Sequence, residues 1–143
     1  MRRFGLSILA VTVAALGVNV LAANEKPSDA MKAIMNANAA ANASARAAAK
    51  AMDYATVLKD AGTYRANLAY IDAYFSHNKL DAAATIAKGG MKAAMDLETA
   101  AAAKNQAGVD AALTAVTGTC GACHKQYREQ DANMQYQLKA GTI

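Results

Sequence analysis

The sequence predicts an all-α protein folded as an antiparallel four-helix bundle, and three observations lead to this fold class. The chain of 143 residues is rich in alanine, the strongest helix former, and contains one proline and no tryptophan. No run of four to eight residues alternates between apolar and polar side chains as a half-buried strand does. Apolar residues instead recur at steps of three and four along four segments with short breaks, which is typical of a bundle.

The first two helices are expected to follow one another almost without a pause. The first runs from Ser28 to about Met52, with Ser28 as the N-cap and Asp29 in the first turn, where a carboxylate interacts favourably with the helix dipole. The second runs from about Asp53 to Phe75. The helical pattern barely changes at residue 53, so the boundary between these two helices is weakly marked.

The third helix is expected over residues 82–104, after a polar turn at residues 76–79. Asp81 stands at the position of its cap. Gly89-Gly90 is expected to bend or split this helix, because each glycine costs roughly 1 kcal/mol relative to alanine in a helix interior.

The fourth helix is expected over residues 109–139, after a break at residues 105–108. The four helices would face one another largely through alanine. Alanine buries little area, and at about 25 cal/mol per Å² an alanine seam stabilises a bundle far less than a leucine seam. The sequence therefore predicts that a large apolar group, such as a buried cofactor, completes the core.

Residues 1–23 have the layout of a secretory signal peptide: two arginines precede the uncharged stretch Phe4–Leu21, and small residues follow. Cleavage is expected after Ala22 or Ala23. The alternative is an uncleaved membrane anchor, for which roughly 18 apolar residues is a borderline length. Cleavage would leave one domain, residues 24–143, in the periplasm without stable membrane insertion. The basic residues are scattered, so no nucleic-acid-binding patch is expected.

The sequence Cys120-Gly121-Ala122-Cys123-His124 is a C-x-x-C-H motif, the attachment signature of c-type haem. Two thiols one helical turn apart can add to the two vinyl groups of the porphyrin. The histidine directly after the second thiol can then offer an imidazole nitrogen to the iron. The motif predicts one covalently bound haem c, and an export signal agrees with this because haem c is attached outside the cytoplasm.

The same side chains could also serve in a zinc site or in a thiol-redox pair. A zinc site needs four ligands, whereas Cys120, Cys123 and His124 supply three and His77 is the only other histidine. A thiol-redox pair of the thioredoxin kind needs a βαβ context that the pattern lacks. Both remain weaker interpretations than haem.

The motif continues to C-x-x-C-H-x-x-Y-R over residues 120–128, on the last helix of an all-α chain. With this ending the chain resembles the cytochrome c′ family and its low-spin, methionine-ligated relatives. The start of the domain is also similar, with Lys26-Pro27 before a helix that carries Ile34 to Asn38. The resemblance implies a four-helix bundle with haem c bound near one end, and often a homodimer through the first two helices.

The resemblance also implies roles for single residues. Cys120 and Cys123 would be the thioether anchors and His124 the proximal iron ligand. Arg128 would lie one turn beyond His124 on the same helix face, close to the haem. Tyr127 and Arg128 equally fit ordinary helix packing and a solvated charge.

The sixth iron ligand must come from upstream, because Met134 is expected on the same helix as His124 and cannot easily reach the other haem face. The resemblance places a first-helix methionine there in low-spin members, and Met35 matches that position, with Met31 one turn earlier as the alternative. Any methionine here also fits a flexible core filler. The other upstream candidates are Met52, Met91, Met95 and His77.

The expected function is that of a periplasmic c-type cytochrome that carries single electrons to and from redox partner proteins whose identity the sequence does not show. The alternative is a five-coordinate haem protein that binds nitric oxide or carbon monoxide, if no methionine binds the iron. No substrate pocket or general acid–base pair is evident in the sequence, so an enzyme is not expected.

Overall fold

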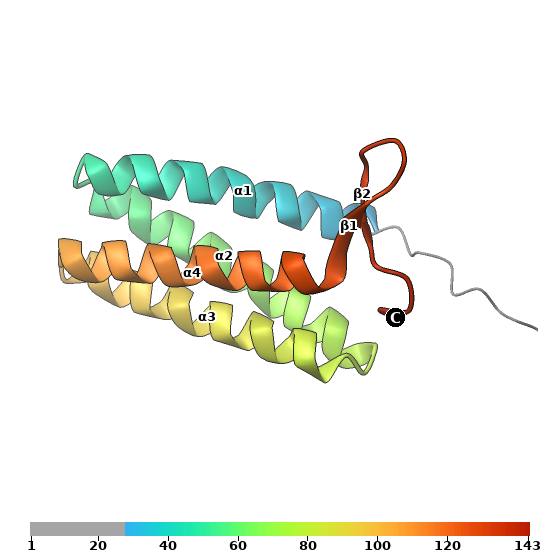
Figure 1. Ribbon diagram of the computed structural model, residues 1–143. Helices are drawn as coiled ribbons and strands as arrows, with labels where there is room; N and C mark the ends of the chain where they lie inside the picture. The colour runs from blue at the N-terminus through green and yellow to red at the C-terminus, as the bar shows by residue number, and fades with distance from the viewer. Residues whose placement is uncertain (1–27) are drawn as a thin grey trace, which may run out of the picture.

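The computed structural model describes residues 28–143, and the expected signal peptide and first domain residues lie outside this part of the chain. Four helices dominate it: α1 (Asp29–Lys50), α2 (Tyr54–His77), α3 (Asp81–Ala102) and α4 (Gln106–Tyr127). Successive helices run in opposite directions, as Figure 1 shows. The expected four-helix bundle is therefore confirmed. Within the described residues, no helix is both long and apolar enough to cross a membrane.

The expected N-cap is confirmed for α1 but not for α3. Ser28 caps α1, because its hydroxyl accepts a hydrogen bond from the backbone N–H of Met31 at 3.1 Å. The prediction for Asp81 is wrong: the N-cap of α3 is Leu80, which makes no side-chain cap bond, and Asp81 lies in the first turn. There its charge still interacts favourably with the helix dipole.

The first three helices end in the same way. Met52, Lys79 and Lys104 follow the three C-caps with positive φ angles of 57°, 58° and 52°. The next N–H in each case returns to the last helical turn at 2.9 Å, as in the bond from Asp53 to the carbonyl of Ala48. This is the Schellman arrangement, here with non-glycine residues in the left-handed position.

The prediction that Gly89-Gly90 interrupts the third helix is wrong, because α3 is continuous through both residues. Gly90 instead permits close packing. A Cβ at this position would lie 3.0 Å from a methyl group of Thr119 on α4 and 3.1 Å from one of Leu68 on α2.

The prediction that the fourth helix continues to residue 139 is also wrong. α4 ends at Tyr127, and Arg128 adopts extended backbone angles. Two short antiparallel strands follow, β1 (Arg128–Gln130) and β2 (Tyr136–Leu138). Met134, expected on the same helix as His124, lies in the turn between them and is 68% exposed.

Local interactions in the hairpin explain why the chain leaves the helical conformation after α4. One carboxylate oxygen of Asp131 accepts hydrogen bonds from two backbone N–H groups of the turn, at 2.8 Å each. Such bonds to nearby N–H groups compete with helix formation. The guanidinium carbon of Arg128 lies 4.0 Å from the centre of the Tyr136 ring, a cation–π contact between the two strands.

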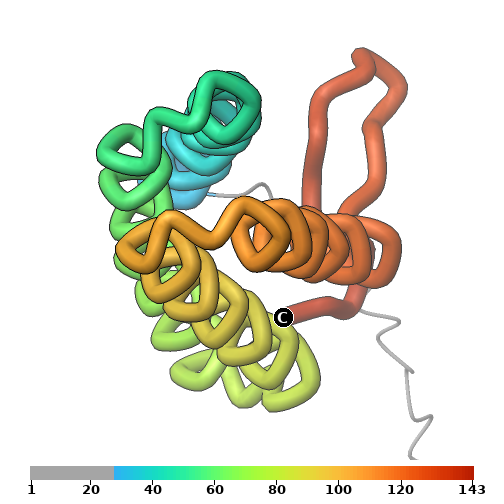
Figure 2. Tube along the Cα trace, turned by 90° about the vertical axis from the view of Figure 1, so that its left-hand side faces the viewer, coloured from blue at the N-terminus to red at the C-terminus, as the bar shows by residue number. Residues whose placement is uncertain are grey.

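The helices pack in chain order around the bundle, and α4 meets α1 through a looser contact than the other neighbours make (Figure 2). Alanine supplies 13 of the 24 buried apolar residues in the described chain, so the expected alanine-rich seam is confirmed. The largest fully buried side chains are those of Tyr64, Leu97, Val57, Val109 and Val116.

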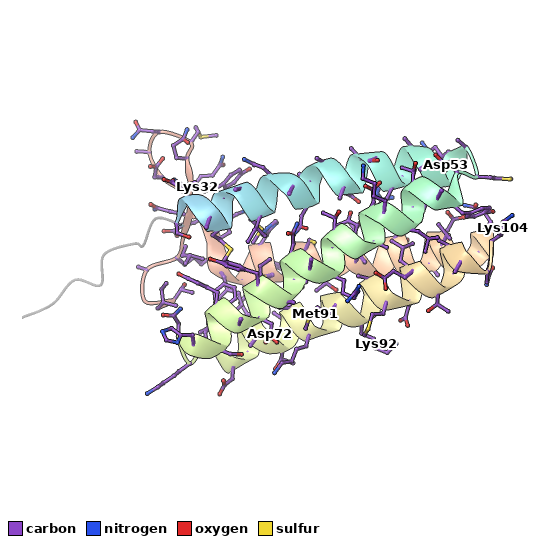
Figure 3. All side chains as sticks on the ribbon, turned by 180° about the vertical axis from the view of Figure 1, so that it is seen from behind. Lys32, Asp53, Asp72, Met91, Lys92 and Lys104 are labelled. Carbon is purple, nitrogen blue, oxygen red and sulfur yellow. The ribbon has the colours of Figure 1, made fainter. Side chains whose placement is uncertain are left out.

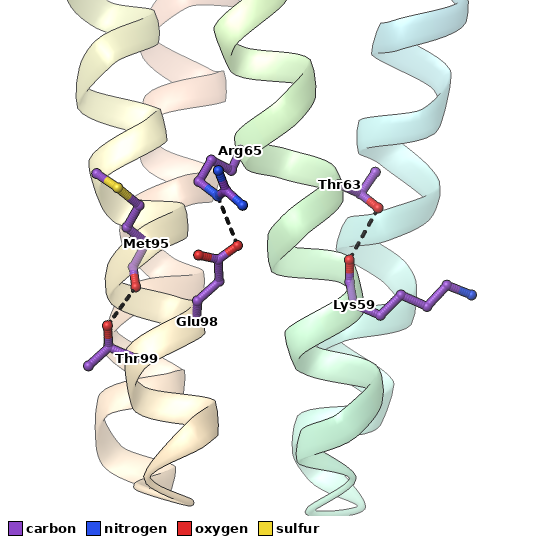
Figure 4. Close-up of polar contacts among 6 residues, drawn as sticks. All are labelled: Lys59, Thr63, Arg65, Met95, Glu98 and Thr99. Carbon is purple, nitrogen blue, oxygen red and sulfur yellow. Dashed lines mark hydrogen bonds and ion pairs between the residues drawn. The ribbon is translucent and has the colours of Figure 1, made fainter.

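Surface contacts between helices contribute little beside this packing. Figure 4 shows the ion pair between Arg65 on α2 and Glu98 on α3, in which Nε and Oε1 are 3.0 Å apart. The Arg65 side chain is half exposed, and ion pairs of this kind stabilise by about 0–1 kcal/mol. The hydroxyls of Thr63 and Thr99 donate only within their own helices.

Candidate cofactor site

A cavity of about 460 Å³ lies at the end of the bundle where α1 begins and α4 ends. This is the end with the hairpin in Figure 1 and with Lys32 in Figure 3; Asp53 and Lys104 mark the opposite end. The volume is typical of sites for cofactors and other small ligands. The apolar side chains that line it include Met31, Met35, Phe75, Tyr127 and Leu138.

A second, smaller cavity of about 30 Å³ lies between the four helices. Its wall includes Asn38 on α1 and Cys120 on α4. Met35, Cys123 and His124 line both cavities. The structure thus brings the predicted methionine on α1 and the last two motif residues on α4 to one shared space. Met31 is buried, at 5% exposure. It lines the large cavity together with His124, but it does not line the small one.

The two cysteines are free thiols, half buried, one helical turn apart on α4. Burial raises the pKa of both thiols. Reactive cysteine pairs depend on a lowered thiol pKa, because the thiolate is the nucleophile. The environment of Cys120 and Cys123 therefore gives no support to a thiol-redox function.

His124 is half buried beside Cys123. Burial is the main cause that lowers the pKa of His124, and the positive charge of Arg128 adds to it. A lowered pKa keeps the imidazole neutral at neutral pH, and the neutral ring is the form that can donate a lone pair to a metal. Among the described residues, no three or more His, Cys, Asp or Glu side chains gather as a metal site.

Tyr127 and Arg128 both line the large cavity, but they do not share a helix as expected, because α4 ends at Tyr127. Tyr127 is 8% exposed, and its ring centre lies 6.2 Å from that of Phe75. Arg128 is the first residue of β1 rather than part of the helix, so its side chain leaves α4 toward Tyr136 of the hairpin.

The remaining ligand candidates lie elsewhere. His77 is exposed at the end of α2, and Met52 and Met95 are 65% and 47% exposed. These three residues line neither cavity, and Met91 on α3 does not line them either. Of the ligands predicted from the sequence, only Met35 and Met31 share a cavity with His124.

Sequence reasoning missed the wall that the hairpin contributes, which consists of residues 135–138. A usable signal was present, since Asp131 and Asn133 are turn formers that follow the motif helix. It also missed the pair formed by Asn38 and Asn67, whose side-chain amides are bonded at 2.9 Å between α1 and α2.

Comparison of the chain with protein-family models, with curated proteins and with solved structures finds no match. The fit of the site to a cofactor therefore rests on its residues. Two thiols spaced for two vinyl groups, a neutral imidazole and a thioether on the facing helix form a donor set suited to haem c. The apolar wall of the large cavity suits the porphyrin ring.

Proposed function

We propose that this protein is an exported c-type cytochrome that carries single electrons through one covalently bound haem. The observation that carries the proposal is that Met35, Cys123 and His124, from two facing helices, line both cavities. When bound, haem c supplies an iron that alternates between the ferric and ferrous states. Residues 1–23 are proposed to direct export to the periplasm.

Each residue of the site has a role in this proposal. Cys120 and Cys123 would form the thioether bonds that hold haem c, and His124 would donate its imidazole nitrogen to the iron. Met35 would supply a second ligand through its thioether sulfur, with Met31 as the alternative. A neutral sulfur ligand favours the ferrous state and so raises the reduction potential.

The surrounding residues exclude water and balance charge. Phe75 and Tyr127 belong to the buried core, which lowers the polarity around the ligands. Lys32 and Arg128 line the large cavity and are the cations available to the porphyrin carboxylates, although Lys32 also pairs with Asp29 at 3.3 Å. These residues would adjust the reduction potential of the haem and include no group assigned to a chemical reaction. We therefore propose an electron carrier and not an enzyme.

The test begins with expression of the full chain in a host that attaches haem c. The expected result is a protein whose haem survives denaturation and acid extraction, whose mass includes one haem, and whose ferric form shows the weak sulfur-to-iron absorption band. Substituting Met35→Ala should abolish that band. Met95→Ala is the matched control, because Met95 is exposed and lines neither cavity.

The other outcomes are equally informative. A chain that leaves the host without covalent haem refutes the proposal. Loss of the band in Met31→Ala but not in Met35→Ala assigns the ligand to Met31. A high-spin spectrum with immediate carbon monoxide binding in the unaltered protein means an open position at the iron, and the gas-binding alternative then replaces electron transfer.

A further inference from the structure

Arg128, the first residue of β1, brings a positive charge to the wall of the large cavity. Its side chain is half buried, and within residues 28–143 it forms no ion pair with a carboxylate. Burial is the main cause that lowers the pKa of His124, and the charge of Arg128 adds to it, so this charge acts on the motif. A long arginine side chain has many rotamers, and its position therefore depends on a contact that holds it.

The ring of Tyr136 on β2 provides that contact. The guanidinium carbon of Arg128 lies 4.0 Å from the ring centre, well inside the range of a cation–π interaction. The register of the hairpin explains why they meet: Arg128 pairs with Leu138, and Tyr136, two residues earlier on β2, lies on the same face. All three side chains line the large cavity. At a partly exposed site, such a contact favours the stacked arrangement by about two- to fivefold.

The second strand is itself attached to the end of α4. The backbone N–H of Lys139 donates to the carbonyl of Tyr127 at 2.9 Å, and its Nζ donates to the carbonyl of Lys125 at 2.9 Å. Both acceptors lie in the last turn of α4, where carbonyls have no partner within the helix. The ring of Tyr136 therefore has a defined position relative to the helix that carries the motif, and not only relative to Arg128.

We propose that Tyr136 is a positioning residue: its ring holds the guanidinium of Arg128 at the wall of the large cavity, where the positive charge raises the reduction potential of the haem. This rests on the proposed haem function. A nearby positive charge disfavours the ferric state, which carries one more positive charge than the ferrous state. Water and salt screen that interaction once the side chain moves into solvent. Tyr136 acts on the potential only through Arg128.

The test measures the reduction potential of the haem protein by spectroscopic titration at fixed pH and salt. Tyr136→Leu should lower the potential, and Arg128→Leu should lower it further. In the Arg128→Leu background, adding Tyr136→Leu should change nothing more, because the ring acts through the guanidinium. Tyr136→Phe keeps an aromatic face and should keep a potential close to that of the unaltered protein. In the reduced protein, the ring current should also shift the side-chain proton resonances of Arg128, and Tyr136→Leu should remove that shift.

Gln135→Leu is the matched control, since Gln135 is exposed, precedes Tyr136 in the hairpin and lines the same cavity. It should leave the potential unchanged. If Tyr136→Leu does not fold, Tyr136→Thr gives the same comparison with a residue that suits a strand. An unchanged potential in the folded variant, or a shift that persists in the Arg128→Leu background, overturns this inference while the cytochrome assignment stands. Absence of covalent haem in the unaltered chain overturns both.

Discussion

The two adjacent glycines of α3 allow a direct test of how closely the helices pack beside the site. Gly89 is exposed, and a Cβ built on it meets nothing within 4 Å. Gly90 is buried, and its Cβ would lie 3.0 Å from the methyl group of Thr119 and 3.1 and 3.3 Å from those of Leu68. The same substitution to alanine should therefore be less favourable at Gly90 than at Gly89.

The magnitudes follow from two contributions. Alanine gains about 1 kcal/mol over glycine in a helix interior at either position. At Gly90 the added methyl group also overpacks the core, which typically costs about 1–3 kcal/mol. Neither neighbour yields easily, because Leu68 is 5% exposed and the Thr119 hydroxyl is bonded to its own helix. Gly89→Ala should stabilise by about 1 kcal/mol, and Gly90→Ala should fall about 1–3 kcal/mol below it.

The assay is urea denaturation of the purified proteins followed by far-ultraviolet circular dichroism, with the midpoint and slope compared among variants. Gly118→Ala on α4 is a second control, because Gly118 is exposed and its Cβ also meets nothing within 4 Å. If Gly90→Ala stabilises as much as Gly89→Ala and Gly118→Ala, α3 can move away from α2 and α4 at little cost. The inferred close packing beside the small cavity would then be wrong.

Two further predictions concern buried polar groups. The hydroxyl of Tyr64 is fully buried without a partner in the described chain, so Tyr64→Phe should stabilise by about 1 kcal/mol in the same assay; a loss of stability would show that an unseen group pairs with it. For His124, a pKa held below the ordinary 6.5 means that the unfolded chain binds the proton more tightly. Without haem, in Cys120→Ala/Cys123→Ala, stability should therefore fall as the pH drops below about 6.5. His124→Gln should flatten that dependence, and an unchanged slope would refute this cause.

Those parts of the candidate site that depend on spacing along one helix could be predicted from the sequence. The interval from Cys120 to His124 fixes one turn of α4, and Met31 and Met35 share one face of α1, whatever the helices pack against. The start at Ser28 was equally readable, because an N-cap is a local hydrogen bond.

The errors arose where a local rule competed with another interaction. Helix propensity alone predicts a break at Gly89-Gly90, but packing against α2 and α4 keeps α3 continuous. Because Gly90 has no side chain, Leu68 and Thr119 can approach its backbone closely. The end of α4 at Tyr127 depends on pairing between two strands of three residues each, which are too short to show alternation in the sequence. The ends of the other helices carry methionine and lysine where glycine is the usual signal.

The sequence by itself determined the helical class and the chemistry offered along α4, since helix propensity and the C-x-x-C-H spacing are properties of neighbouring residues. Only the tertiary structure decided what faces that chemistry. Contact between α1 and α4 brings Met35 to the cavities of His124, the hairpin adds the outer wall, and Asn67 on α2 orients Asn38 on α1. These are contacts between residues far apart in the chain, and they exist only once the helices have packed.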